Sequence, residues 1–136
     1  MIRCTLALAA LALLAGCSST EPTAQDRYGH YATTSDYRSM DRVQLTAAMD
    51  AGLADVDKRR EQLEARAQTL GQDAIDEYHD RESKLSRLRT EFVNELAKLR
   101  AALDKDWKDR REDTVDAFED LRDSLDKAYE EVLDEV

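Results

Sequence analysis

Residues 85–99 read Leu-Ser-Arg-Leu-Arg-Thr-Glu-Phe-Val-Asn-Glu-Leu-Ala-Lys-Leu, and their spacing indicates the fold class. Its large apolar residues recur at steps of three and four, namely Leu85, Leu88, Phe92, Leu96 and Leu99. Residues with this spacing share one face of an α-helix, whereas a half-buried strand would alternate at every second position. The stretch therefore predicts an amphipathic helix.

The same spacing can be followed over most of the chain, and we call this series the apolar stripe. It runs from Leu45 to Trp107 and, after a polar interval, from Thr114 to Val136. Its other members are Met49, Leu53, Val56, Leu63, Ala67, Leu70, Ala74, Tyr78, Leu103, Phe118, Leu121, Leu125, Ala128 and Val132. Because the chain of 136 residues has four Gly and one Pro, it lacks the turn residues of a sheet protein. We expect an all-α protein of long amphipathic helices.

The sequence leaves two arrangements of these helices open. Gly71 is the one residue that could end a helix cleanly, and no strong turn former stands at a second turn near 104–108. We therefore favour an extended, kinked or coiled-coil-like helix. The alternative is a helical hairpin or three-helix bundle that turns at both places. The stripe is interrupted by three arginines, Arg60, Arg81 and Arg110.

A less structured segment is expected before the helices. Residues 17–37 contain no aliphatic side chain larger than Ala, so we interpret them as a flexible tether, with Tyr37 among its scattered tyrosines. The charged helical region should span 38–136, with Ser39 as its N-cap and Asp41 in the first turn.

The amino-terminal residues have the features of an export signal. A positive charge at Arg3 precedes an apolar run that is too short to cross a bilayer, which needs about 20 residues. The run ends in Leu14-Ala15-Gly16-Cys17, which resembles the lipobox of bacterial lipoproteins. The resemblance covers about the first twenty residues. It implies that residues 1–16 are a signal peptide cleaved between Gly16 and Cys17, and that Cys17 carries an S-diacylglycerol and an N-acyl group.

The same resemblance implies a location. In that family an Asp directly after the Cys commonly retains the protein at the inner membrane, whereas this chain has Ser18. We therefore expect the periplasmic face of the outer membrane in a host with two membranes. Several acyl chains suffice for stable anchoring, since each buried methylene contributes about 0.8 kcal/mol.

The charge balance excludes some partners. There are 30 acidic and 20 basic residues, a net charge of −10, whereas nucleic acid binding needs clustered Lys and Arg. The acid is concentrated in 112–136, where 11 acids and 2 bases give −9, against 14 acids and 12 bases (−2) in 38–104. This acidic end is either a docking surface for a basic partner or a solubilising surface.

The sequence shows no pattern for catalysis or for binding a metal or cofactor. His30 and His79 lack metal-ligand spacing, and Asp104, Asp106 and Asp109 lack the central Gly and final Glu of an EF-hand loop. We find no Gly-rich phosphate loop and no nucleophile motif. We expect no enzymatic activity, no cofactor and no small-molecule substrate.

These observations favour a lipid-anchored structural or interaction protein of the cell envelope that presents long helices to a periplasmic partner. The stripe must be covered by the chain folding back, by a second copy or by another protein, because a lone helix gains little stability from propensity. This chain resembles murein lipoprotein in architecture only, with a lipobox, a short polar lead and an amphipathic helix. The alternative is a periplasmic chaperone-like or apolar-ligand-binding helical module.

Overall fold

The computed structural model describes residues 33–134, all of whose regular structure is helical. It comprises α2 (Thr34–Ser39), α3 (Arg42–Leu70), α4 (Gln72–Ala101), a short 3-10 helix η1 (Asp104–Asp106) and α5 (Trp107–Asp134). The all-α class and the long helices are thus confirmed. The predicted signal peptide, the lipidation at Cys17, most of the tether with His30, and Val136 lie outside the described residues.

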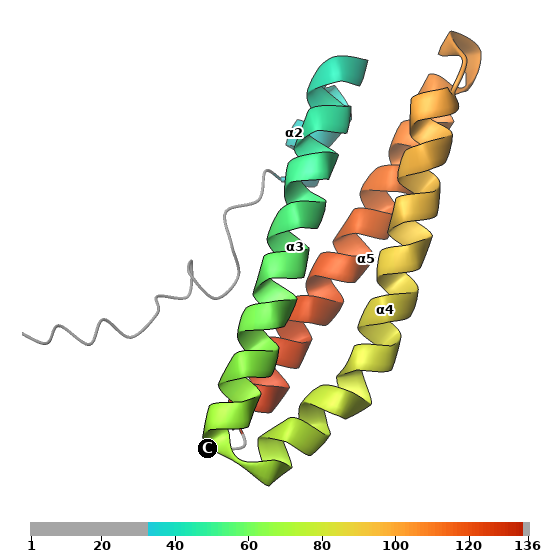
Figure 1. The fold of residues 1–136 in the computed structure, drawn as a ribbon. Coiled ribbons are helices and arrows are strands. Elements are labelled where there is room, and N and C mark those ends of the chain that lie inside the picture. The colour runs from blue at the N-terminus through green and yellow to red at the C-terminus, as the bar shows by residue number, and fades with distance from the viewer. Residues whose placement is uncertain (1–32, 135–136) are drawn as a thin grey trace, which may run out of the picture.

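The three long helices form a bundle (Figure 1). α4 runs antiparallel to α3, and α5 runs back antiparallel to α4, so the end of α5 lies near the α3–α4 turn. The extended, kinked helix that we favoured is wrong, and the three-helix alternative is the observed arrangement. Folding back buries the stripe within one chain, which removes apolar surface from water without a second molecule.

The second turn forms without Gly or Pro because a distant residue supports it. Arg42 of α3 donates a hydrogen bond from Nη1 to the carbonyl oxygen of Ala102 (2.8 Å). Its guanidinium carbon also lies 4.6 Å from the centre of the Trp107 ring, a cation–π contact at the start of α5. Residues 102–106 therefore turn where local sequence alone gives little signal.

The starts of α2 and α3 are set by capping boxes, whereas α4 begins after Gly71 without a side-chain cap. Asp41, rather than Ser39, is the N-cap of α3: its side chain accepts from the Gln44 amide (2.8 Å), and the Gln44 side chain accepts from the Asp41 amide (3.1 Å). Ser39 is instead the last residue of α2, whose own box joins Thr33 and Asp36.

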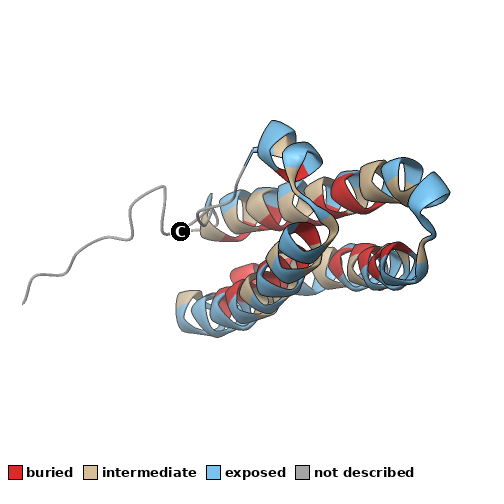
Figure 2. Ribbon diagram, turned by 90° about the horizontal axis from the view of Figure 1, so that it is seen from above, coloured by how far each residue is buried: buried red, intermediate tan, exposed pale blue. Residues whose placement is uncertain are grey.

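The interior of the bundle is built from the stripe, and Figure 2 shows the buried positions facing inward. Seventeen apolar stripe residues are buried: Leu45, Met49, Val56, Leu63, Ala67, Ala74, Tyr78, Leu85, Leu88, Phe92, Leu96, Leu99, Phe118, Leu121, Leu125, Ala128 and Val132. Thr114 is buried with them. Leu103 departs from the prediction, because it is 63% exposed at the second turn.

Tyr37 belongs to the core, so its assignment to the tether was wrong. It is 4% exposed and meets the Phe118 ring edge-on, with 5.7 Å between ring centres. Phe118 also packs against Phe92 at 5.3 Å and against the backbone of Gly52, where an added Cβ would lie 2.7 Å from the Phe118 ring. The folded part of the chain therefore begins before residue 38.

Candidate functional site

Of the acidic and histidine residues considered above as metal ligands, those within residues 33–134 form no site. His79 is exposed on α4, with Nδ1 3.4 Å from Glu82 Oε2. Asp104 and Asp106 are exposed in η1. Within residues 33–134 no three His, Cys, Asp or Glu side chains are grouped so that they could hold a metal ion. Among the helices of residues 33–134, none combines the length and the apolar character that crossing a membrane requires.

A polar groove of about 470 Å³ lies between α3 and α4. We call it the α3–α4 groove. Its walls contain Asp57, Arg60, Glu61 and Glu64 from α3, and Tyr78, Glu82, Ser86, Arg89 and Thr90 from α4. These nine residues carry four carboxylates and two guanidinium groups, a net charge of −2.

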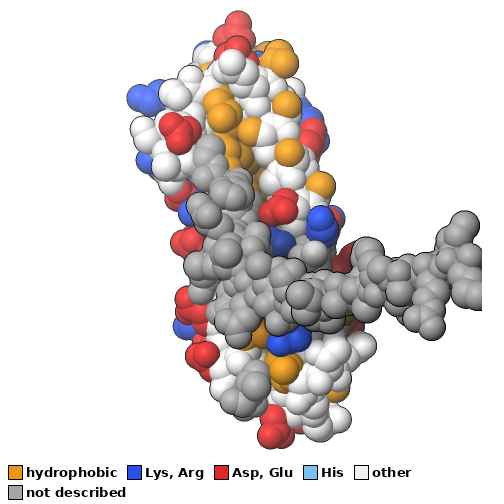
Figure 3. Space-filling view, turned by 90° about the vertical axis from the view of Figure 1, so that its left-hand side faces the viewer, with side chains coloured by type: hydrophobic (Ala, Val, Ile, Leu, Met, Phe, Trp, Pro, Cys, Tyr) orange, Lys and Arg blue, Asp and Glu red, His pale blue; other side chains and the backbone are white. Residues whose placement is uncertain are grey.

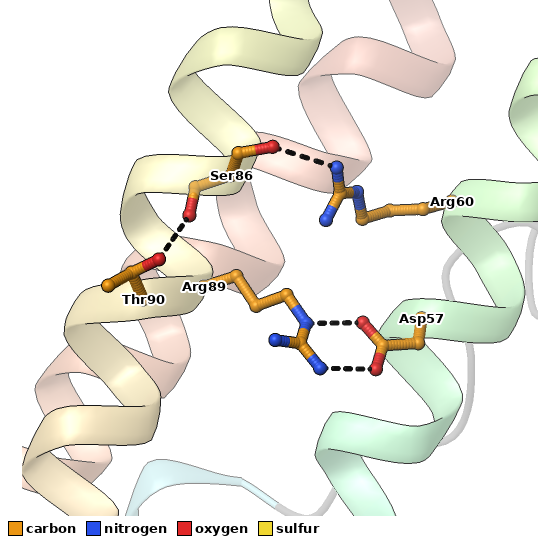
Figure 4. Close-up of polar contacts among 5 residues, drawn as sticks. All are labelled: Asp57, Arg60, Ser86, Arg89 and Thr90. Carbon is orange, nitrogen blue, oxygen red and sulfur yellow. Dashed lines mark hydrogen bonds and ion pairs between the residues drawn. The ribbon is translucent and has the colours of Figure 1, made fainter.

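A bidentate ion pair closes one part of the groove (Figure 4). Arg89 donates from Nε and from one terminal nitrogen to the two carboxylate oxygens of Asp57, at 2.7 and 2.8 Å. This hydrogen bonding lowers the pKa of Asp57, although partial burial opposes the shift. Asp57 therefore stays ionised at neutral pH, which suits a structural or binding role and not that of a general acid.

Arg60 and Ser86 form the next contact along the groove. Arg60 donates from Nη2 to Ser86 Oγ at 3.1 Å, and Thr90 Oγ1 donates to the Ser86 carbonyl oxygen at 3.0 Å (Figure 4). Tyr78 contributes an aromatic wall and is 3% exposed. Burial raises the pKa of Tyr78, and the charges of Glu64 and Glu82 add to the shift. The groove can thus receive polar groups, and its charge favours basic ones.

The outer surface of α3 exposes several small apolar residues in its first half, beside the polar Gln44 and Asp50. Val43 is 77% exposed, and Ala47, Ala51 and Ala54 are exposed at the same helical spacing. Figure 3 shows hydrophobic side chains gathered in the upper part of the face that α3 forms. α3 therefore presents a group of exposed apolar residues followed by an acidic groove.

A buried ion pair between α3 and α5 was not predicted from the sequence. Arg59 is 3% exposed, and its Nη2 lies 2.7 Å from Asp126 Oδ1. Tyr129 stacks at 5.1 Å from the Arg59 guanidinium and donates from its hydroxyl to the Arg59 carbonyl oxygen at 2.7 Å. The signal was present in the spacing, since Arg59 falls three residues after Val56 and four before Leu63. Arg59 therefore fills the buried position of the stripe between Val56 and Leu63, where we had expected Arg60 to interrupt the stripe.

The acidic end has a role that neither of our alternatives included. Glu112 pairs with Arg38 of α2 at 2.6 Å, Asp126 pairs with Arg59 of α3, and Glu131 pairs with Arg81 of α4 at 2.5 Å. Several acids of α5 thus hold the other helices in place.

No family model, curated protein or solved structure matches this chain.

Proposed function

We propose that this chain is a lipid-anchored protein of the bacterial cell envelope that presents a three-helix bundle to a protein partner at the periplasmic face of the outer membrane. The observation that carries this proposal is Leu14-Ala15-Gly16-Cys17 at the end of a short apolar run. Fifteen residues, 18–32, separate the lipidated Cys17 from the first described residue. Fully extended, they span at most about 50 Å, which limits how far the bundle can reach from the membrane.

The fold shifts the expected contact surface. Because the stripe is buried within one chain, a partner has to contact other residues. The outer surface of α3 supports such a contact, since it joins exposed apolar residues to the acidic α3–α4 groove. Apolar centres with polar surroundings are typical of protein interfaces. We propose that the partner contacts α3 and places basic side chains at Glu64 and Glu82.

The anchor is tested by metabolic labelling with a fatty-acid analogue in a diderm bacterial host. The wild-type chain should incorporate the label and stay with the membrane fraction until detergent is added. Cys17→Ser should abolish labelling. Cys4→Ser is the matched control, because this cysteine lies within the expected signal peptide, and it should be labelled like the wild type. Label retained by Cys17→Ser, or absent from the wild type, would refute the anchor.

The contact surface is tested by crosslinking in intact cells. Glu64→Gln combined with Glu82→Gln should weaken the recovery of crosslinked partners several-fold, because it removes two negative charges from the groove. Glu119→Gln on α5 removes one charge outside the groove and should leave recovery unchanged. Equal recovery from all three proteins would exclude the groove as the contact.

A further inference from the structure

The connection between α3 and α4 consists of one non-helical residue. α3 ends at Leu70 and α4 begins at Gln72. Between them Gly71 has φ 119° and ψ −173°, and it is the one residue within 33–134 with a positive φ. Residues with a side chain rarely adopt this conformation. A Cβ at Gly71 would meet no atom within 4 Å, so Gly is required by the positive φ and not by a lack of space.

Helical hydrogen bonds continue on both sides of this residue. The Gly71 amide donates to the Ala67 carbonyl at 3.2 Å, and the Ile75 amide donates to the Gly71 carbonyl at 3.1 Å. Both bonds have the four-residue spacing of an α-helix. The first amides of α4 and the last carbonyls of α3 lack partners within their own helices, and straightening the chain at Gly71 would supply them.

The apolar stripe also keeps its phase across Gly71. Ala67 before the turn and Ala74 after it are both buried, and they are seven residues apart, close to two helical turns. A helix running straight through Gly71 would therefore carry both on one face. The second turn differs, because Leu103 of the stripe is exposed there.

We propose that α3, together with α2 that precedes it, is exchanged between two copies of this chain. Gly71 straightens, and α3 and α4 join into one helix of 60 residues (29 + 1 + 30). α2 and α3 of each copy then pack on α4 and α5 of the other, so the contacts of α2 with α5 are also remade. The partner is thus a second copy of the chain, recognised by the contacts that α3 makes in the monomer. These include Arg59 with Asp126 and Asp57 with Arg89.

The exchange is favoured by the shortness of the hinge. Helices in bundles are usually joined by about two to eight residues, and short hinge loops under strain promote exchange. Each monomer contact can be remade between copies with the same atoms, so the exchange loses none of them. Confinement of anchored copies to one membrane would raise their effective concentration. The proposal itself does not depend on the lipid anchor.

Gly71→Ala tests the hinge in a chain that starts at Ser18, which retains every described contact. Ala disfavours the turn and favours a continuous helix, and each dimer has two hinges. The dimer association constant should therefore rise on the order of a thousandfold, as measured by sedimentation equilibrium. Asp106→Ala, an exposed change at the second turn, is the control and should leave the constant within a few-fold of wild type. Insertion of Gly-Gly-Ser after Gly71 should instead give a monomer.

A thiol crosslink then distinguishes exchange from other forms of dimer. In a chain carrying Asp57→Cys and Arg89→Cys, a short bis-maleimide should join two chains if α3 is exchanged and one chain to itself if it is not. The two-chain product should dominate with Gly71→Ala, and it should grow with concentration when Gly71 is retained. A monomeric Gly71→Ala protein, or crosslinks confined to one chain at every concentration in both backgrounds, would overturn the exchange. Either result would leave the anchor proposal untouched.

Discussion

Asp57 and Asp126 each meet an arginine, yet their surroundings shift the two pKa values in opposite directions. Hydrogen bonding from Arg89 lowers the pKa of Asp57 at the edge of the groove. Burial raises the pKa of Asp126, and the hydrogen bond and charge of Arg59 only partly offset this shift. The folded state therefore favours the charged form of Asp57 and disfavours that of Asp126.

Asp57→Asn should lower the free energy of unfolding by about 0.5 kcal/mol at pH 7, because both partners of the Arg89 pair are partly exposed. Since the folded-state pKa of Asp57 is lowered, its contribution is present above about pH 4 and is lost as the pH falls through that pKa. Urea unfolding at several pH values measures the difference. A stability loss of Asp57→Asn that grows as the pH falls would contradict the lowered pKa of Asp57.

Arg59→Met should lower the free energy of unfolding by about 2–3 kcal/mol at pH 7, because it leaves the Asp126 carboxylate without its buried partner. The pKa of Asp126 should rise further, so the deficit should shrink as the pH falls. In the double variant with Asp126→Leu, most of the stability should return. If urea unfolding instead shows that the stability loss of the double variant is the sum of the losses of the two single variants, Arg59 and Asp126 do not act as a pair.

The elements were predictable where the signal was local. The three- and four-residue spacing located the long helices, and Gly71 was identified as a helix end from its residue type alone. Ser39 was wrongly assigned as the N-cap because α2 was not foreseen: its one buried residue, Tyr37, is held by Phe118 of α5. The second turn depends on Arg42, which is 60 residues away from Ala102. Neither contact can be read from a local pattern.

Arg42→Ala should lower the free energy of unfolding by about 1–2 kcal/mol, because it removes a charged hydrogen bond and a cation–π contact. The emission of Trp107, the single tryptophan of the chain, should change as its ring loses this cover. Arg87→Ala is the control, since it removes an exposed pair with Glu91 on one helix and should cost about 0.3 kcal/mol. Unaltered Trp107 emission in Arg42→Ala would contradict the role of Arg42 at this turn.

At the scale of the whole molecule, folding back decides which surfaces are available. The apolar stripe had to be buried, and the sequence left open whether the chain itself or another molecule buries it. The α3–α4 groove could not be predicted either, because it depends on helices that meet only after the turn at Gly71. Asp57 and Arg89 are 32 residues apart, and nothing in their local sequence pairs them. The lipidation of Cys17 stays a prediction from the sequence.

The acidic residues of the carboxyl end also contribute to the fold of the whole molecule. The concentration of acid in 112–136, with a net charge of −9, suggested either a docking surface or a solubilising surface at the carboxyl end. In the bundle Glu112, Asp126 and Glu131 of that end pair with arginines of the other helices. The acid excess therefore both stabilises the arrangement of the helices and leaves a negative outer surface.

Intact mass spectrometry of the chain purified from a diderm host's membranes would measure lipid attachment at Cys17 itself. We predict a protein that begins at residue 17, with the mass of a diacylglyceryl group and an amide-linked acyl chain added there. A protein that begins at Met1, or one whose Cys17 sulfur is a free thiol, would contradict it.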